Sequence, residues 1–157
     1  IAACEQLGRP LKVAGVGPEL EDLKSRAGKH TEFLGFVPDA DLPKLYAGAK
    51  ALLFPQEEDF GITPLEAAAS GKPTIAFRAG GAIETVVDGV TGVFFDEQTP
   101  ASLAAAIMQS EAVRFDPLAI YGHGQTFDRS RFLDEMGQLV QNEWVQHEQN
   151  MIGRQYA

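Results

Sequence analysis

The sequence predicts an α/β domain, a Rossmann-like parallel sheet with helices on both faces. Short apolar runs of strand length alternate with helix-length stretches along most of the chain, which is typical of parallel sheets. Proline, glycine and capping residues stand at the borders of these stretches, so the elements are clearly separated. At 157 residues and 45% hydrophobic content, the chain is long enough for one domain with its own core.

Five apolar runs have the length of buried strands, and each is followed by a turn-forming or charged residue. They are residues 11–16, 31–34, 51–54, 74–77 and 92–95. The stretches around them predict helices. The expected helices are 1–7, 18–27, 41–47, 63–71, 82–87, one from 99, one from 116 and a long one from 129 toward the carboxyl end.

Several of these helices open with a capping residue followed by proline. The pairs are Thr63–Pro64, Thr99–Pro100 and Asp116–Pro117. A capping oxygen accepts a hydrogen bond from a free first-turn amide, and proline loses no hydrogen bond at the first helical position. Asp41, with Pro43 inside the first turn, predicts a similar start. Gly71 followed by Pro73 predicts the end of the helix that Thr63 opens.

Composition argues against several classes of function. The net charge is −9 and lysines and arginines form no run, so nucleic-acid binding through a basic face is not expected. The single cysteine, Cys4, allows no intramolecular disulfide or Cys-rich metal site and fits a cytoplasmic protein. No apolar run reaches the roughly 18 residues that span a bilayer, and no signal-peptide pattern is present. The first residue is not methionine, and residues 1–7 look like the last turns of a helix, so we expect a fragment of a longer protein.

The unusual loops all follow predicted strands. They are Gly15–Gly17, Phe36–Val37, residues 55–62 and residues 78–81. The carboxyl ends of parallel strands meet at one edge of a sheet, and ligands bind there. We therefore expect these four loops to share a single edge.

The helix start after Gly61 has two interpretations. Gly61 lets the backbone pass close to a ligand, and the free amides and dipole of the following helix form a ready phosphate site. Alternatively, Thr63 to Glu66 is a capping box, in which Glu66 bonds back to the amide of Thr63. Both interpretations place Glu66 in the first turn, and these residues alone leave both open.

Residues 51–92 combine motifs that resemble the core of family-four retaining glycosyltransferases, which have the GT-B fold. That family shows a strand, Glu-x-Phe-Gly and Glu-Ala-x-Ala-x-Gly-x-Pro, then a strand, Gly-Gly-x-x-Glu and Asp-Gly-x-Thr-Gly. The matching segments are Pro55, Glu58–Gly61, Glu66–Pro73, Gly80–Glu84, Asp88–Gly92 and, upstream, Val13–Pro18 and Phe33–Val37. The resemblance covers roughly residues 11–96. It implies the carboxy-terminal half of a GT-B fold that lacks its first strand, which would lie beside residues 11–16.

The resemblance also implies a binding site for a nucleoside diphosphate sugar. Glu58 is the implied catalytic residue, which holds hydroxyls of the transferred sugar without acting as a covalent nucleophile. Glu66 is implied to accept hydrogen bonds from the ribose hydroxyls, and Phe36–Val37 to lie near the base. The implied donor-binding residues are Gly15, Gly17, Val37, Phe60, Gly61, Ile62, Thr63, Glu66, Gly80, Gly81 and Glu84.

The resemblance further implies a donor and partners. Residues 58–62 look most like mannosyltransferases of bacterial polysaccharide assembly, which suggests GDP-mannose, while UDP-sugars stay open. No metal and no other cofactor are implied. An acceptor-binding amino-terminal domain upstream of Ile1 is implied, with an arginine and a lysine that neutralise the diphosphate. Residues 129–157 would cross toward that domain, which could attach the protein to the inner face of a membrane. The 157 residues alone are then expected to transfer nothing.

Other functions compete with this one. They are a non-catalytic nucleotide-binding α/β module and a dehydrogenase-type cofactor domain. Against the dehydrogenase, Gly15–Gly17 lacks the third glycine of the dinucleotide fingerprint because Leu20 stands at its position. The three histidines are too far apart in sequence for metal-ligand spacing. Arg78 is either a phosphate ligand or a solvated loop cation.

Overall fold

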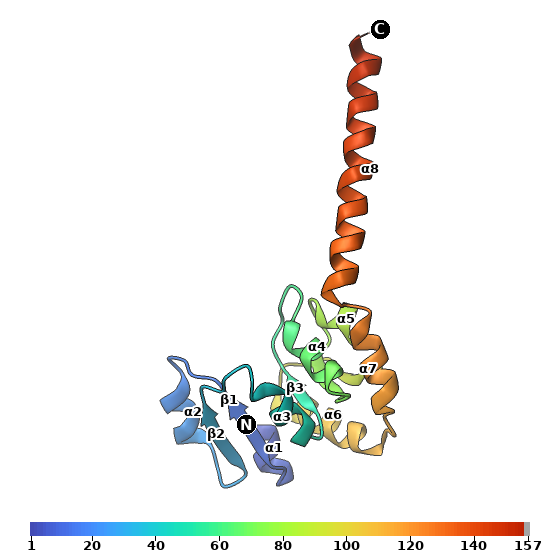
Figure 1. The fold of residues 1–157 in the computed structure, drawn as a ribbon. Helices are drawn as coiled ribbons and strands as arrows, with labels where there is room; N and C mark the ends of the chain where they lie inside the picture. The colour runs from blue at the N-terminus through green and yellow to red at the C-terminus, as the bar shows by residue number, and fades with distance from the viewer. Residues whose placement is uncertain (156–157) are drawn as a thin grey trace.

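The computed structural model of the protein describes residues 1–155 (Figure 1). Its strands are β1 Leu11–Ala14, β2 Thr31–Gly35, β3 Leu52–Phe54, β4 Thr74–Phe77 and β5 Gly92–Phe95. Every hydrogen-bonded pair of these strands is parallel. The predicted class, α/β with parallel strands, is therefore confirmed.

The strands divide into two sheets. β1 pairs with β2, and β4 lies between β3 and β5 in the second sheet. Within residues 1–155, no ladder of hydrogen bonds joins one sheet to the other. The predicted sheet is thus interrupted where the chain passes from its first pair of strands to β3.

The predicted helices are all present. Their bounds are α1 Ala2–Leu7, α2 Leu20–Arg26, α3 Leu42–Gly48, α4 Ile62–Ala69, α5 Ala82–Thr85, α6 Pro100–Ala112, α7 Pro117–Gln125 and α8 Arg129–Gln155. α2 and α5 are shorter than the sequence predicted. The last two residues of the predicted helix 129–157 lie outside the described residues.

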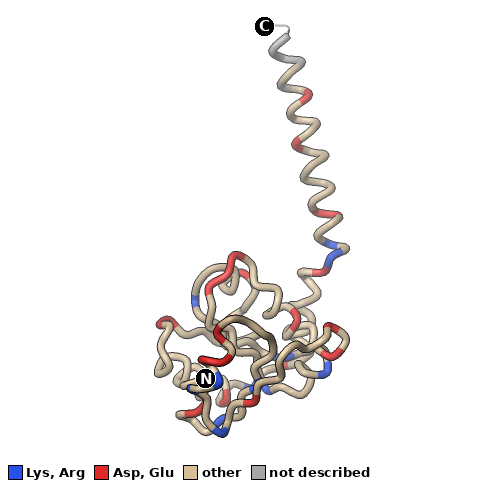
Figure 2. Tube along the Cα trace, turned by 90° about the vertical axis from the view of Figure 1, so that its left-hand side faces the viewer, with Lys and Arg blue, Asp and Glu red and all other residues tan. Residues whose placement is uncertain are grey.

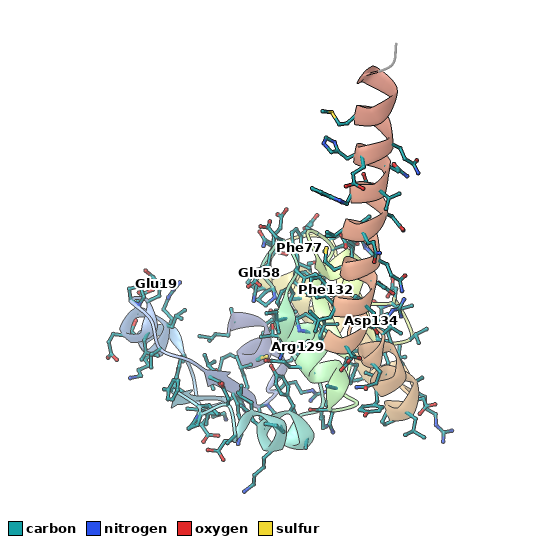
Figure 3. The ribbon with its side chains drawn as sticks, turned by 45° about the horizontal axis from the view of Figure 1, so that its top comes forward. Glu19, Glu58, Phe77, Arg129, Phe132 and Asp134 are labelled. Carbon is teal, nitrogen blue, oxygen red and sulfur yellow. The ribbon has the colours of Figure 1, made fainter. Side chains whose placement is uncertain are left out.

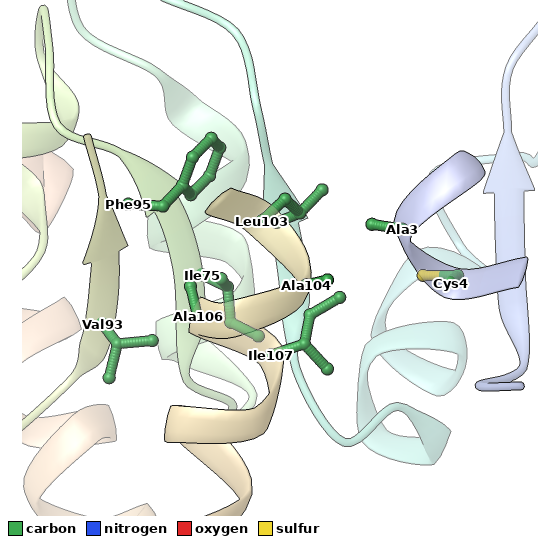
Figure 4. Close-up of a cluster of buried hydrophobic side chains, with 9 residues drawn as sticks. All are labelled: Ala3, Cys4, Ile75, Val93, Phe95, Leu103, Ala104, Ala106 and Ile107. Carbon is green, nitrogen blue, oxygen red and sulfur yellow. The ribbon is translucent and has the colours of Figure 1, made fainter. Parts of the chain in front are cut away.

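The core lies around the second sheet. Ile75 and Ala76 are neighbours on β4 and belong to different buried clusters, so both faces of this sheet are covered. The larger cluster joins β4 and β5 to α6, and α1 packs on α6 in turn (Figure 4). Ala3 and Cys4 of α1 are buried there together with Ile107. Packing of α1 therefore connects the start of the chain to the second sheet.

The first sheet is far less buried than the second. From Glu5 to Leu53 no residue is fully buried, and β1 alternates between half-buried and exposed residues. Glu5 of α1 bonds to the segment that precedes β2. Its carboxylate accepts hydrogen bonds from the amide of His30 at 3.1 Å and from the Thr31 hydroxyl at 2.8 Å. This carboxylate therefore ties the first sheet to the helix that anchors in the core.

The Glu5 bonds predict a pH dependence of stability. Burial alone would raise the pKa of the Glu5 carboxyl, but bonds from Thr31, His30 and Gly28 hold this pKa below its ordinary value. A lowered folded pKa means that the contribution to stability is complete above the unfolded value of about 4.3 and is lost as pH falls through the folded value. We expect Glu5→Gln to lower the free energy of unfolding at pH 7, and the gap to wild type to close below about pH 4. Urea unfolding between pH 7 and pH 3 measures this gap, and a gap that does not change with pH contradicts the prediction.

Two of the four predicted caps are confirmed, Asp41 is the N-cap of α3 but its side chain forms no capping bond, and the cap at Thr63 is wrong. The Thr99 hydroxyl accepts from the amide of Ser102 at 3.2 Å, and the Asp116 carboxylate accepts from the amide of Leu118 at 2.9 Å.

At α4, by contrast, Thr63 does not cap. The helix begins at Ile62, its N-cap is Gly61 with a φ of 78°, and none of the described side chains caps it. Proline is tolerated anywhere in a first turn, because the amides there have no intrahelical partner, so Pro64 could not fix the start. Glu66 consequently lies in the second turn of α4 rather than the first.

Helix α8 projects from the body of the molecule as a single arm (Figure 1). The large apolar residues at helical spacing on it are all exposed, and Trp144 is 62% exposed. They are Phe132, Met136, Leu139, Val140 and Trp144. None of the helices in the described part of the chain is both long and apolar enough to cross a membrane. Lysines and arginines are spread along the trace without forming a basic segment (Figure 2).

Candidate functional site

The strands of both sheets begin at the same edge of the molecule. An open hollow of about 580 Å³ brings together Pro10 before β1, Ala51 before β3 and Pro73 before β4. Because the strands of each sheet are parallel, their carboxyl ends face the opposite edge. The loops 55–61 and 78–81 follow the carboxyl ends of β3 and β4, so they lie away from this hollow and share the other edge of their sheet.

Two loops at the carboxyl edge pack against each other through their backbones. The loop 55–61 follows β3, and the turn 78–81 follows β4. The amide of Gly81 donates a hydrogen bond to the carbonyl oxygen of Glu58, at 2.7 Å. No side chain fits between the loops, because a Cβ on Gly81 would lie 2.6 Å from the Asp59 carbonyl oxygen and would overlap the backbone of Phe60. The glycine turn therefore supports the loop that carries Glu58.

Residues 57–63 line an open hollow of about 640 Å³ at this edge. Helix α4 begins in its wall. The amides of Gly61, Ile62 and Thr63 donate to no acceptor within the described residues, and Pro64 has no amide hydrogen. Free first-turn amides, together with the positive end of the helix dipole, attract an anion. The hollow can therefore hold a phosphate group against the start of α4.

The same hollow carries carboxylates. Glu57, Glu58 and Asp59 are consecutive exposed acids, and no lysine or arginine stands among the residues that line it. One oxygen of Glu58 accepts a hydrogen bond from the Gln56 amide group at 3.1 Å, and the other meets no donor among the described residues. Figure 3 places Glu58 at the end of the body from which α8 rises. A carboxylate with a free oxygen suits a ligand that offers hydroxyl groups.

Aromatic contacts tie the Glu58 loop to the junction between α7 and α8. The ring of Phe60 meets the ring of Phe127 edge-on, with centroids 6.2 Å apart, and Phe127 meets the ring of His123 in the same way at 5.4 Å. His123 Nε2 donates to the carbonyl oxygen of Thr85 at 3.0 Å, because a carbonyl can only accept. Residues from α5 and α7 thus hold the loop from its other side, and no sequence spacing predicted this.

Glu66 bonds to a tyrosine instead of its own helix start. The hydroxyl of Tyr46, on α3, donates to the Glu66 carboxylate at 2.9 Å. Within the described residues no hydrogen bond joins Glu66 to the amide of Thr63, so the capping-box interpretation is wrong. Burial, and next the hydrogen bond and the charge of Glu66, raise the pKa of the Tyr46 phenol. The hydroxyl therefore stays protonated and donates at physiological pH.

Arg78 is an exposed loop cation, as one of its two interpretations predicted, but it is paired with carboxylates, and contact with a phosphate stays a prediction. Its guanidinium donates to Asp96 at 2.8 Å and to Asp88 at 3.1 Å, and lies 4.5 Å from the centre of the Phe94 ring. These contacts fasten the start of the glycine turn to the residues around β5. Arg78 therefore acts through structure, by holding the turn that supports Glu58.

Other predicted site residues lie apart from the hollow. Gly15 and Gly17 follow β1 and Val37 follows β2, in the other sheet, and none of them lines the hollow. Glu84 is exposed on α5, close in sequence to the glycine turn. In no place within residues 1–155 do three His, Cys, Asp or Glu side chains gather as a metal site requires.

Comparison with known proteins places these motifs in a family. The model of the glycosyl transferases group 1 matches residues 2–114. The glycogen synthase of Mycobacterium tuberculosis is 37% identical over 118 residues, which cover 71% of this chain and 28% of that protein. A GDP-mannose-dependent alpha-(1-6)-phosphatidylinositol monomannoside mannosyltransferase of Mycolicibacterium smegmatis is 36% identical over 110 residues, which cover 62% of this chain and 29% of that protein. The chain thus spans less than a third of the length of these curated relatives.

A solved structure extends the likeness to the fold. The apo form of the lipopolysaccharide outer core galactosyltransferase WaaB superposes with a TM-score of 0.75, at 17% identity, over 85% of this chain and 41% of that one. At this identity the likeness concerns the fold alone. It confirms the predicted fold class, half of a GT-B fold with its parallel strands and covering helices.

Proposed function

The chain belongs to the glycosyl transferases group 1 family, and from this premise we propose that it binds a nucleoside diphosphate sugar as the donor part of a retaining glycosyltransferase. One observation carries the proposal. The free first-turn amides of α4 and the carboxylate of Glu58 face the same hollow. The amides suit the diphosphate, and the carboxylate suits the hydroxyls of the sugar.

Each group then has a part in the reaction. As the bond from the sugar to the diphosphate breaks, negative charge grows on the leaving group and positive charge on the sugar ring. Preorganised amides at the start of α4 stabilise the leaving group, and Glu58 keeps the sugar in place. A helix terminus contributes only about 0.3–2 kcal/mol, so we propose that cations from elsewhere in the protein, and no divalent metal, neutralise the rest.

The donor and the partners form part of the same proposal. The likeness of residues 58–62 to mannosyltransferases, and a relative whose name includes GDP-mannose, favour GDP-mannose over UDP-sugars. The exposed apolar face of α8 supports a partner domain that binds the acceptor and covers this face. Attachment to the inner face of a membrane would occur through that domain.

Calorimetric titration tests the proposal against its alternatives. We expect GDP or UDP, and the corresponding sugar nucleotide, to bind, and NAD not to bind, because the dinucleotide fingerprint is absent. Tighter binding of NAD supports the dehydrogenase alternative, and no binding of any nucleoside diphosphate overturns the proposal. Transfer of labelled sugar to a glycan or lipid acceptor by the full-length protein then separates an enzyme from a non-catalytic nucleotide-binding module.

Glu66 provides a sharper prediction. We expect Glu66→Gln to weaken binding of the nucleoside diphosphate by roughly fivefold to 100-fold, because a charged acceptor forms stronger hydrogen bonds with the ribose hydroxyls than a neutral one. Glu143→Gln is the matched control, because it makes the same exchange on an exposed residue of α8 away from the hollow. An unchanged affinity in Glu66→Gln, together with a lower melting temperature, shows that Glu66 only stabilises the fold.

A further inference from the structure

We propose that Tyr46 is a positioning residue, whose hydroxyl holds the Glu66 carboxylate in the orientation that receives the ribose of the donor nucleotide. The inference rests on the proposed function, since it concerns the same site. Tyr46 is not part of any motif that the sequence singled out. It enters the site only because α3 packs beside α4.

The geometry allows one tyrosine to control one carboxylate. The Tyr46 hydroxyl lies 2.9 Å from Oε2 of Glu66, and both side chains are half-buried between their helices. Tyr46 is the only hydrogen-bond donor to this carboxylate among the described residues. A carboxylate has about four acceptor positions, so one bond leaves Oε1 and part of Oε2 for a ligand.

Glu66 does not line the hollow but follows it along α4, where we expect the ribose. It lies in the second turn of α4, about 6 Å along the helix axis from Ile62, at a rise of about 1.5 Å per residue. The free amides stand at the start of the helix, and Glu58 precedes it. A diphosphate at the amides, with its sugar toward Glu58, would direct its nucleoside end along α4 toward Glu66.

Positioning matters because a glutamate side chain is flexible. An unrestrained glutamate side chain samples several rotamers. Fixing it in one rotamer when the ligand binds costs conformational entropy, which lowers the affinity. The bond from Tyr46 orders the side chain before the ligand arrives. Since the hydroxyl stays protonated at physiological pH, the restraint does not switch off there.

The alternative is that the bond merely joins two helices. In that case Tyr46→Phe lowers stability, and the preference of the site for a ribose hydroxyl is unchanged. The two explanations therefore differ in ligand discrimination and not in melting temperature.

The experiment uses calorimetry to measure the affinities of GDP and 2′,3′-dideoxy-GDP for wild type and for Tyr46→Phe. If UDP binds more tightly than GDP, UDP and 2′,3′-dideoxy-UDP are used instead. We expect wild type to prefer the ribonucleotide by about tenfold or more, as one or two hydrogen bonds to a charged group imply. Tyr46→Phe should reduce this preference about three- to tenfold, through weaker binding of the ribonucleotide alone. Tyr121→Phe is the matched control, because Tyr121 is an exposed tyrosine on α7, and it should change neither affinity.

A double-mutant cycle with Glu66→Ala completes the test. If Tyr46 acts through Glu66, Tyr46→Phe has no further effect on discrimination once the carboxylate is absent. A wild type that binds both nucleotides equally overturns the ribose role of Glu66, and with it the role of Tyr46. A wild type that discriminates, with Tyr46→Phe discriminating equally, overturns the inference on Tyr46 alone. Melting curves show whether each variant is folded. If Tyr46→Phe is not folded, Tyr46→Met, which also lacks the hydroxyl, takes its place with the same expected results.

Discussion

Replacing Gly81 with alanine is expected to weaken binding of a nucleoside diphosphate sugar by about 100-fold and to lower the stability of the fold. Gly81 has a φ of −63°, which alanine adopts without strain, so the effect is steric only. The added Cβ would lie 2.6 Å from the carbonyl oxygen of Asp59 and would overlap the backbone of Phe60. Backbone atoms cannot rotate away as a side chain could, so the whole Glu58 loop must shift. The hydrogen bond from Gly81 to Glu58 would then break.

The size of the expected effect follows from the steric overlap and from the broken hydrogen bond. Overpacking costs about 1–3 kcal/mol and the lost hydrogen bond about 0.5–1.5 kcal/mol of stability, which together lower the melting temperature by several degrees. A displacement of about 1 Å at a binding site can reduce activity about 100-fold. Gly122→Ala is the matched control, because a Cβ there meets no atom within 4 Å. Wild-type affinity in Gly81→Ala would show that the Glu58 loop does not depend on the glycine turn.

The second large effect is expected at Glu58. Glu58→Gln should remove the extra affinity that the sugar of a sugar nucleotide adds over the nucleoside diphosphate alone. Loss of hydrogen bonds to a charged group corresponds to about 1.5–3 kcal/mol, or roughly 10- to 150-fold in the ratio of the two dissociation constants. Calorimetric titration of wild type and variant with GDP and GDP-mannose, or with UDP and UDP-glucose, measures this ratio.

The neighbouring acid separates this role from a general charge effect. Glu57→Gln removes the same charge from the same hollow, where it should slightly strengthen binding of an anionic diphosphate. If Glu58 contacts the sugar, the two variants change the affinity for the sugar nucleotide in opposite directions. If both variants strengthen binding of the sugar nucleotide equally, Glu58 acts only as a surface charge.

Local chemistry made part of the fold predictable. Thr99 and Asp116 cap their helices as predicted, because the residue before a proline is biased toward the extended conformation that an N-cap residue needs. The start of α4 was not predictable in the same way. Thr63–Pro64 looks like the same pair, yet Gly61 turns the chain earlier, and proline is compatible with any first-turn position. The division into two sheets depends on long-range strand pairing, which no local pattern records.

In the candidate site, too, features set by local sequence were predictable and features set by long-range contacts were not. The motifs located Glu58, Gly61 and the glycine turn, because these residues belong to short segments that follow strands. They could not reveal that Tyr46 bonds to Glu66, because the two residues lie 20 positions apart on separate helices. A weaker signal existed, since successive helices around one strand of a parallel sheet tend to pack side by side. Phe127 and His123 gave no signal, and only the folded chain shows that they hold Phe60.

The position of Phe127 has a mechanical consequence for the arm formed by α8. Asp128 follows Phe127 and accepts a hydrogen bond from the amide of Ser130, in the first turn of α8. Helix α8 contains 27 residues and is about 40 Å long. Its base lies beside the Glu58 loop, so a small rotation at the base becomes a large movement at the tip. A rotation of about 10° at the base would move the tip by about 7 Å at that length. A force applied at the far end of α8 would therefore reach the Glu58 loop through the contact between Phe127 and Phe60, and it would be multiplied by the length of the helix.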